Sequence, residues 1–110
     1  MVNPLRLAVA RLHTSAVVMY DSTDAYAIPA DAQLVAGYVD GYVSAPAMID
    51  RFGKSKVVTI SVNNSDAMVA DVEPGAMRAS DLPGWVDRQV ARGIKTPVVY
   101  SDGSDLPHVF

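Results

Sequence analysis

The chain contains five short apolar runs, and most of them are continuously apolar rather than alternating between apolar and polar residues. Continuous, β-branched runs of this length are typical of strands covered on both faces, as in a parallel sheet. Each run ends in polar or small residues, which is typical of the sheet edge where the active site of a parallel α/β protein opens. The expected strands are 16–20, 34–39, 56–62, 67–72 and 97–100.

Helical patterns separate several of these runs. One helix is expected over 45–52, and Gly53 is expected to end it because glycine is favoured just past a helix C-terminus. A second helix is expected from the candidate N-caps at 80–81, with a proline in its first turn, to Gly93. Trp85 lies on its apolar face, so we interpret this residue as a buried anchor rather than a sugar-stacking surface.

The N-terminal segment is set apart from these elements. Leu5, Val9 and Leu12 fall at helical spacing, which predicts a short amphipathic helix, with a flexible leader as the alternative. Two arginines interrupt the segment, so it lacks the apolar run of a secretory signal, and no run is long enough to span a membrane. We therefore divide the chain into a leader or short helix over 1–15 and an α/β domain over 16–110.

One interval does not fit a uniform alternation of strands and helices. Only residues 63–67 separate Val62 from Met68. A parallel crossover usually needs a dozen or more residues, so a helix does not fit there. Either these two strands are antiparallel neighbours joined by a turn, or one of the two strand predictions is wrong.

The composition narrows the classes of function. Half of the 110 residues are hydrophobic and only 19% are charged, which suggests that a partner or a missing remainder covers part of the surface. The net charge of −3 argues against a nucleic-acid binder held by phosphate contacts. The chain has no cysteine, and His13 and His108 are far apart in sequence, so neither a metal site nor a cofactor is expected.

The most informative stretch is the strand end at 69–75. If the backbone is extended there, Asp71 and Glu73 point to one face and their apolar neighbours to the other. Glycoside hydrolysis needs such a pair, because one carboxyl protonates the leaving oxygen while another stays ionised. The alternative is that both are ordinary solvated residues, since two acids at this spacing are common.

Two further acids and two tyrosines lie near other strand ends. Asp21 ends the first expected strand and Asp40 ends the second. Acids at the ends of several parallel strands would gather their carboxylates at one edge of the sheet. Singly, each is more typical of a loop cap. Tyr38 and Tyr42 are candidates to line a glycan cleft, although a buried ring with its hydroxyl at the edge is the simpler interpretation. Asp40, Tyr38 and Tyr42 are therefore the candidate substrate-binding residues.

A family resemblance runs through these motifs in chain order. It spans about residues 17–102, and its most specific blocks are Gly-Tyr-Val-Asp-Gly at 37–41 and Asp-Val-Glu-Pro-Gly at 71–75. The remaining blocks are 19–22, 28–32 and 82–86. Together they resemble the glycoside-hydrolase-like proteins of actinobacteria and their phages, which are distant relatives of the family 25 lysozymes.

The resemblance implies a (β/α)-barrel-like fold and cleavage of the glycan strand of peptidoglycan. It also implies that Glu73 is the proton donor, while Asp71 and Asp21 stabilise charge or position the sugar. A complete barrel takes roughly 250 residues, so the chain supplies about half of one. We therefore expect an incomplete (β/α)-barrel-like α/β fold with a mostly parallel sheet of about five strands, in an extracellular or virion-associated protein.

A second interpretation starts from the missing half of the barrel. Open strand edges pair readily with other chains, so the protein is alternatively a non-catalytic phage virion or tail component that serves in structure or attachment. Another protein chain would then cover the open sheet edge. A third possibility is a fragment of a longer gene product. Under the first interpretation the partner is peptidoglycan glycan or another carbohydrate, and neither nucleic acid nor a membrane is expected.

Overall fold

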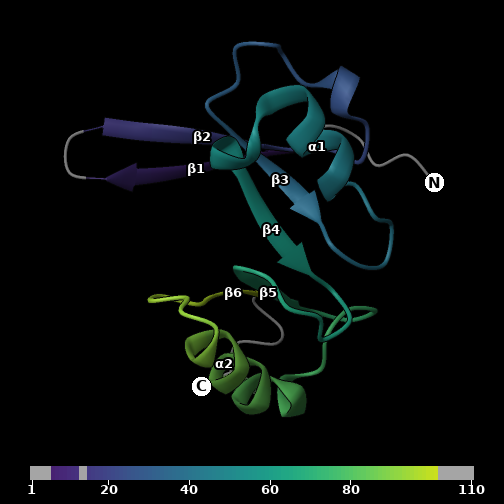
Figure 1. Cartoon of the computed structure of the whole chain (residues 1–110), viewed down its shortest axis with the longest axis vertical. Coiled ribbons are helices and arrows are strands. Elements are labelled where there is room, and N and C mark those ends of the chain that lie inside the picture. The colour runs from purple at the N-terminus through teal and green to yellow at the C-terminus, as the bar shows by residue number, and fades with distance from the viewer. Residues whose placement is uncertain (1–5, 13–14, 102–110) are drawn as a thin grey trace. The chain divides into compact units, whose positions relative to one another are not determined.

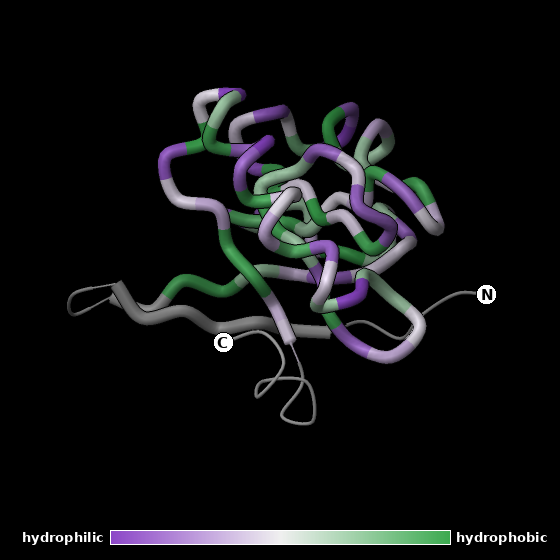
Figure 2. Tube along the Cα trace, turned by 90° about the horizontal axis from the view of Figure 1, so that it is seen from below, coloured by the Kyte–Doolittle hydropathy of each residue, from purple (hydrophilic) through white to green (hydrophobic). Residues whose placement is uncertain are grey.

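The structure, a computed structural model, describes residues 6–12 and 15–101, with side chains from residue 17 onward. Its hydrophobic stretches, green in Figure 2, are short and alternate with hydrophilic ones. The chain divides into two compact units, each described here by itself. The first comprises Met1–Tyr38 and Tyr42–Val58, and the second comprises Val39–Gly41 and Thr59–Phe110.

Over the described residues, the sheet consists of six strands that follow one another in chain order (Figure 1). β2 pairs with β3, β4 with β5 and β5 with β6 in parallel, whereas β1 pairs with β2 antiparallel. Sequential parallel strands with helices between them form an incomplete (β/α)-barrel-like α/β fold, which confirms the expected fold class. The strands are β1 (Arg6–Leu12), β2 (Ser15–Asp21), β3 (Leu34–Tyr38), β4 (Val57–Ser61), β5 (Val69–Val72) and β6 (Val98–Ser101).

In the first unit, helix α1 (Ala45–Phe52) lies beside β3 (Figure 1). Its limits are those expected from the sequence, because a proline stands in its first turn and Gly53, with φ of 88°, follows its last residue. A short 3₁₀ turn, Ala25–Ala27, is capped by Asp24, which accepts a hydrogen bond from the Tyr26 N–H. The buried core of this unit consists of Ala25, Ile28, Ala32, Val35, Met48, Phe52 and Val57.

The segment expected to form an N-terminal helix is strand β1, so that prediction is wrong. All seven of its residues pair with β2, from Arg6 opposite Asp21 to Leu12 opposite Ser15. An isolated helix of this length is marginal in water because its first turn is costly to nucleate. A strand beside β2 instead satisfies its backbone groups by pairing, so a neighbour in space overrides the local helical spacing.

In the second unit, helix α2 (Leu82–Ala91) packs on one face of β5 and β6. Its expected start and end are confirmed, with a proline in its first turn and Gly93 in the left-handed region (φ 94°) just beyond it. Trp85 is fully buried, and its indole Nε1 donates a hydrogen bond to the Ser65 carbonyl at 2.7 Å. Its interpretation as a buried anchor is therefore confirmed. The core of this unit consists of Ala70, Val72, Met77, Leu82 and Trp85.

The short connection between β4 and β5 joins parallel strands, so the antiparallel alternative is wrong and both strand predictions hold. The pairing begins with Ile60 opposite Val69 and continues with Ser61 opposite Ala70. The start of β5 is thus level with the end of β4. A parallel connection normally has to return the chain to the start of the preceding strand. Here β5 starts beside the end of β4, so residues 62–68 make the connection without a crossover helix.

Candidate functional site

The two acids of the Asp-Val-Glu motif flank the last residue of β5. The backbone is extended up to Val72, as expected. Ala70 and Val72 pack into the core around Trp85, so alternation along the strand places Asp71 on the opposite face. Asp71 is buried, and Glu73 is half-buried one residue beyond the strand. The local geometry therefore puts one carboxyl inside the strand and the other at its open end.

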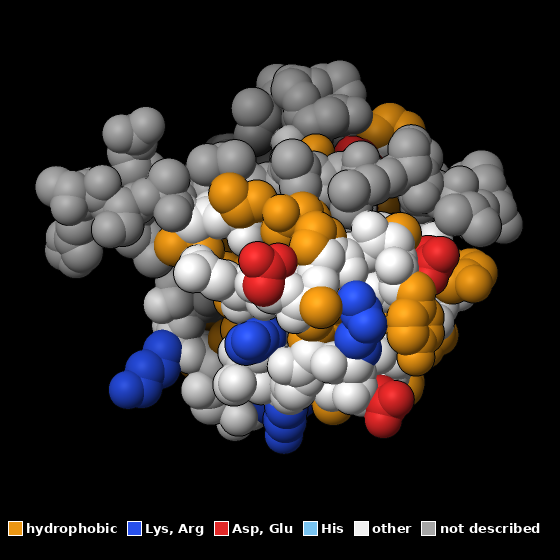
Figure 3. Space-filling model, turned by 90° about the horizontal axis from the view of Figure 1, so that it is seen from above, with side chains coloured by type: hydrophobic (Ala, Val, Ile, Leu, Met, Phe, Trp, Pro, Cys, Tyr) orange, Lys and Arg blue, Asp and Glu red, His pale blue; other side chains and the backbone are white. Residues whose placement is uncertain are grey.

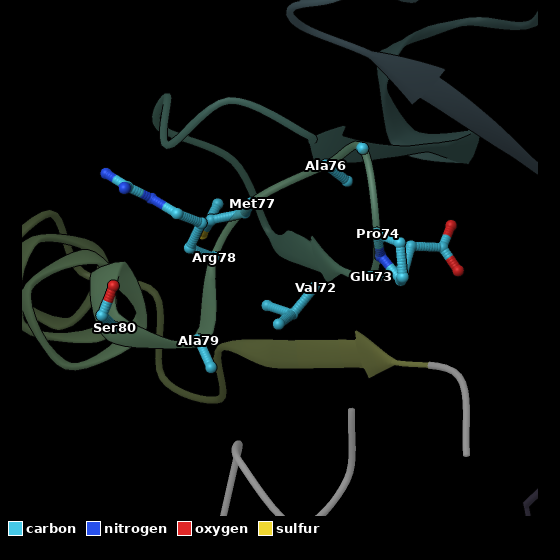
Figure 4. Close-up of a pocket in the computed structure, with 9 residues that line it drawn as sticks. Val72, Glu73, Pro74, Ala76, Met77, Arg78, Ala79 and Ser80 are labelled. Carbon is cyan, nitrogen blue, oxygen red and sulfur yellow. The ribbon is translucent and has the colours of Figure 1, made fainter. Parts of the chain in front are cut away.

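The chain turns back directly after these acids. The Ala76 N–H donates to the Glu73 carbonyl at 2.9 Å, and the Met77 N–H donates to the Asp71 carbonyl at 3.1 Å. Residues 72–80 line a cavity of about 420 Å³ in the second unit (Figure 4). In that view the Glu73 carboxylate points away from Val72 and Met77. Glu73 therefore lies at the rim of the cavity with its carboxylate turned outward.

Asp21 and Tyr38 are brought together in the first unit. Asp21 is the last residue of β2 and Tyr38 the last residue of the neighbouring strand β3. The Tyr38 hydroxyl lies 2.8 Å from one carboxylate oxygen of Asp21 and 2.9 Å from the other, and it donates its proton there. The Tyr38 residue is buried, and its N–H donates to the Ser44 hydroxyl at 3.0 Å. Tyr38 thus has the simpler of its two expected arrangements, a buried ring with the hydroxyl at the strand end.

Asp40 accepts hydrogen bonds from the end of β4 within the second unit. One carboxylate oxygen accepts from the Val62 N–H at 2.7 Å, and the other accepts from the Ser61 hydroxyl at 2.7 Å and the Asn63 N–H at 3.1 Å. Burial raises the pKa of Asp40, but hydrogen bonds from Ser61, Ser65 and these two backbone groups outweigh it and hold the pKa below its ordinary value. The carboxylate expected to bind substrate therefore caps the strand end.

The tyrosines predicted to line a cleft differ in exposure. Tyr42 is 59% exposed, whereas Tyr38 is 8% exposed. A tyrosine that sequence analysis did not single out for the site, Tyr100 on β6, stands directly opposite Asp71 in the strand pairing. No sequence pattern could have identified it, because the register between two parallel strands is set by packing far along the chain.

A second residue that the sequence analysis did not single out, Gln89, joins the β4–β5 connection to α2 through hydrogen bonds. Gln89 is fully buried, accepts a hydrogen bond from the Ala67 N–H at 3.2 Å and donates to Asp66 at 3.0 Å. The bond from Gln89, together with the charges of Arg92 and Arg88, holds the pKa of the exposed Asp66 below its ordinary value. The available signal was a polar side chain at an apolar-face position of the predicted helix.

Neither the charged side chains nor the metal-ligating residue types of the described residues form a further candidate site. On the face seen in Figure 3, the basic and acidic side chains that are drawn are interspersed with apolar ones. Within the described ranges, no three His, Asp or Glu side chains gather as ligands for a metal ion. Neither α-helix in that part of the chain has the length and apolar character to cross a membrane.

No family model matches this chain, no curated protein is significantly similar in sequence, and no solved structure is significantly similar in fold. The resemblance to the family 25 lysozyme relatives therefore stays a prediction that rests on the motifs at 37–41 and 71–75. Any functional assignment depends on the local geometry of the acids.

Proposed function

We propose that the chain is a glycoside-hydrolase-like domain that acts on the glycan of cell-wall peptidoglycan. The observation that carries the proposal is the pair Asp71 and Glu73, placed on either side of the last residue of β5. Active sites of parallel α/β folds open at the carboxyl ends of the strands, and this is such an end. Carboxylates are also the only side chains that glycoside hydrolysis ordinarily requires.

The proposed roles of the acids are those that the family resemblance implies. Glu73, half-buried beyond the strand, donates a proton to the glycosidic oxygen while the bond to the anomeric carbon breaks. Asp71, held within β5, stabilises the positive charge that develops on the sugar ring. Water then supplies the new hydroxyl and returns a proton to Glu73. The resemblance assigns Asp21 to charge stabilisation or sugar positioning, with its carboxylate held by Tyr38.

Release of soluble glycan from purified peptidoglycan tests this proposal with the full chain. Glu73→Gln is expected to lower the rate at least about 100-fold, because general acid catalysis contributes about 10²–10⁴. Asp87→Asn is the matched control, since Asp87 is an exposed acid on α2 in the same unit. Fluorescence of the buried Trp85 checks that each variant is folded. Equal release by wild type and a folded Glu73→Gln variant would remove Glu73 from the mechanism.

A non-catalytic role in phage structure or attachment is the second candidate. It is favoured by β6, which among the described residues ends the strand order with β5 as its one sheet neighbour. β6 also carries the half-exposed Val98 and Tyr100. Such an edge pairs readily with another chain. Under this proposal the protein self-associates or docks on another protein, in a virion-associated or extracellular setting. A monodisperse monomer in sedimentation velocity, with glycan release intact, would exclude it.

A further inference from the structure

The register between β5 and β6 places an aromatic ring beside the buried acid. Asp71 pairs with Tyr100, and Val69 pairs with Val98. Residues opposite one another in neighbouring parallel strands point to the same face of the sheet. Val99 packs against the cluster around Trp85, so Val98 and Tyr100 lie on the face of β6 opposite α2. Tyr100 and Asp71 therefore share the face that α2 does not cover.

The two paired residues differ sharply in exposure. Asp71 is 6% exposed, whereas Tyr100 is 52% exposed. A tyrosine within a sheet usually packs its ring in the core, but Tyr100 is half exposed on the strand position opposite Asp71. The electron-rich face of an aromatic ring attracts the polarised C–H bonds on one face of a pyranose, and aromatic side chains commonly line small-molecule sites.

We propose that Tyr100 is a substrate-contacting residue whose ring stacks on a pyranose ring held next to Asp71. The inference rests on the proposed glycoside-hydrolase function and adds a specificity element to it. A stacked sugar beside Asp71 needs an apolar C–H face, as the β-linked N-acetylhexosamine units of cell-wall glycans have. The contribution comes from the ring and not from the hydroxyl, so phenylalanine should replace tyrosine at this position.

Oligosaccharide binding by calorimetry tests this inference in the full chain. The parent carries Glu73→Gln so that the glycan stays intact, and the probe is a tetrasaccharide of β-1,4-linked N-acetylglucosamine. Tyr100→Ala is expected to weaken binding at least about ten-fold, as truncation of an aromatic anchor does. Tyr100→Phe is expected to stay within about three-fold of the parent. Val98→Ala is the matched control, because Val98 lies on the same face of β6 and is 49% exposed.

The outcomes separate this inference from the proposed function. Binding by the parent that Tyr100→Ala leaves unchanged would overturn the stacking role alone, as would an equal loss in Tyr100→Phe and Tyr100→Ala. Equal weakening by Val98→Ala would also overturn it, because the effect would then belong to the strand and not to the ring. Failure of the parent to bind, together with absence of glycan release by wild type, would overturn both proposals.

Discussion

The hydroxyl of Tyr38 bridges both carboxylate oxygens of Asp21, at 2.8 and 2.9 Å, and so ties together the ends of β2 and β3. The two residues are 17 positions apart in sequence. The pairing fixes the orientation of an acid that the sequence motif marks as part of the candidate site. It also makes the stability of the first unit sensitive to a single oxygen atom.

Tyr38→Phe removes that oxygen and keeps the buried ring. We expect a loss of about 1–2 kcal/mol in the free energy of unfolding, because hydrogen bonds to charged groups are worth more than neutral ones. Chemical denaturation monitored by circular dichroism measures the loss. Tyr42→Phe is the control, since Tyr42 is largely exposed, and it should change stability by less than about 0.5 kcal/mol. Equal stability of the two variants would contradict a structural role for the Tyr38–Asp21 bond.

The lowered pKa of Asp40 predicts a specific acid sensitivity. A carboxyl whose pKa is depressed by folding contributes stability above its unfolded value, near 3.8, and this contribution is lost as the pH falls through the lower folded value. Asp40→Asn should therefore lower stability at pH 7 by about 1–2 kcal/mol and weaken the dependence of stability on pH below about 4. Unfolding curves between pH 2 and about 7 measure both effects.

The control for this prediction is Asp31→Asn. Asp31 is an exposed acid in the first unit, outside the hydrogen bonds that Asp40 accepts. The Asp31→Asn substitution should leave the free energy of unfolding at neutral pH, and the dependence of that free energy on acid pH, nearly unchanged. The same acid dependence in Asp40→Asn and wild type would show that Asp40 is not the group responsible.

Gly41 is predicted to be intolerant of a side chain for two separate reasons. Its φ of 67° lies in the left-handed region, and an added Cβ would stand 2.7 Å from the Cγ2 of Val62. Gly93 has φ of 94° with no atom near its added Cβ, so Gly93→Ala measures the backbone penalty of about 1–2 kcal/mol. Gly41→Ala should exceed that penalty by at least about 1 kcal/mol through overpacking.

A double variant separates the two causes at this glycine. Adding Val62→Ala to Gly41→Ala removes the clashing methyl groups and should recover the excess penalty but not the backbone part. Thermal unfolding of the single and double variants gives the comparison. An excess that persists in the double variant would contradict the contact as its cause.

Local chemistry made most elements of this fold predictable. The five parallel strands were found because most of them are short, continuous β-branched runs, and the helices because prolines and glycines bound them. The strand prediction over 67–72 included the extended backbone around Asp71 and its separation from its apolar neighbours, since alternation is a property of any strand.

Non-local pairing made the remainder unpredictable. Strand β1 forms because β2 lies beside it, and nothing within its own residues outweighs the helical spacing. The hydrogen bonds that Asp40 accepts were not predicted because its partners, Ser61 and Val62, lie 21 and 22 residues away. Tyr100 was not singled out for the site because its position opposite Asp71 depends on a register that no single strand encodes.

The start of β5 pairs with the end of β4, and this short-range pairing affects the order in which the strands form. Ile60 meets Val69 nine residues later, whereas Val69 meets Val98 only after 29. Shorter loops cost less entropy to close, so we expect β4 and β5 to pair before β6 joins them. Conservative substitutions in β4 should then slow refolding, while those in β6 chiefly speed unfolding. Because the connection is short and contains no crossover helix, the pairing of β4 with β5 would be the first step in folding of the second unit.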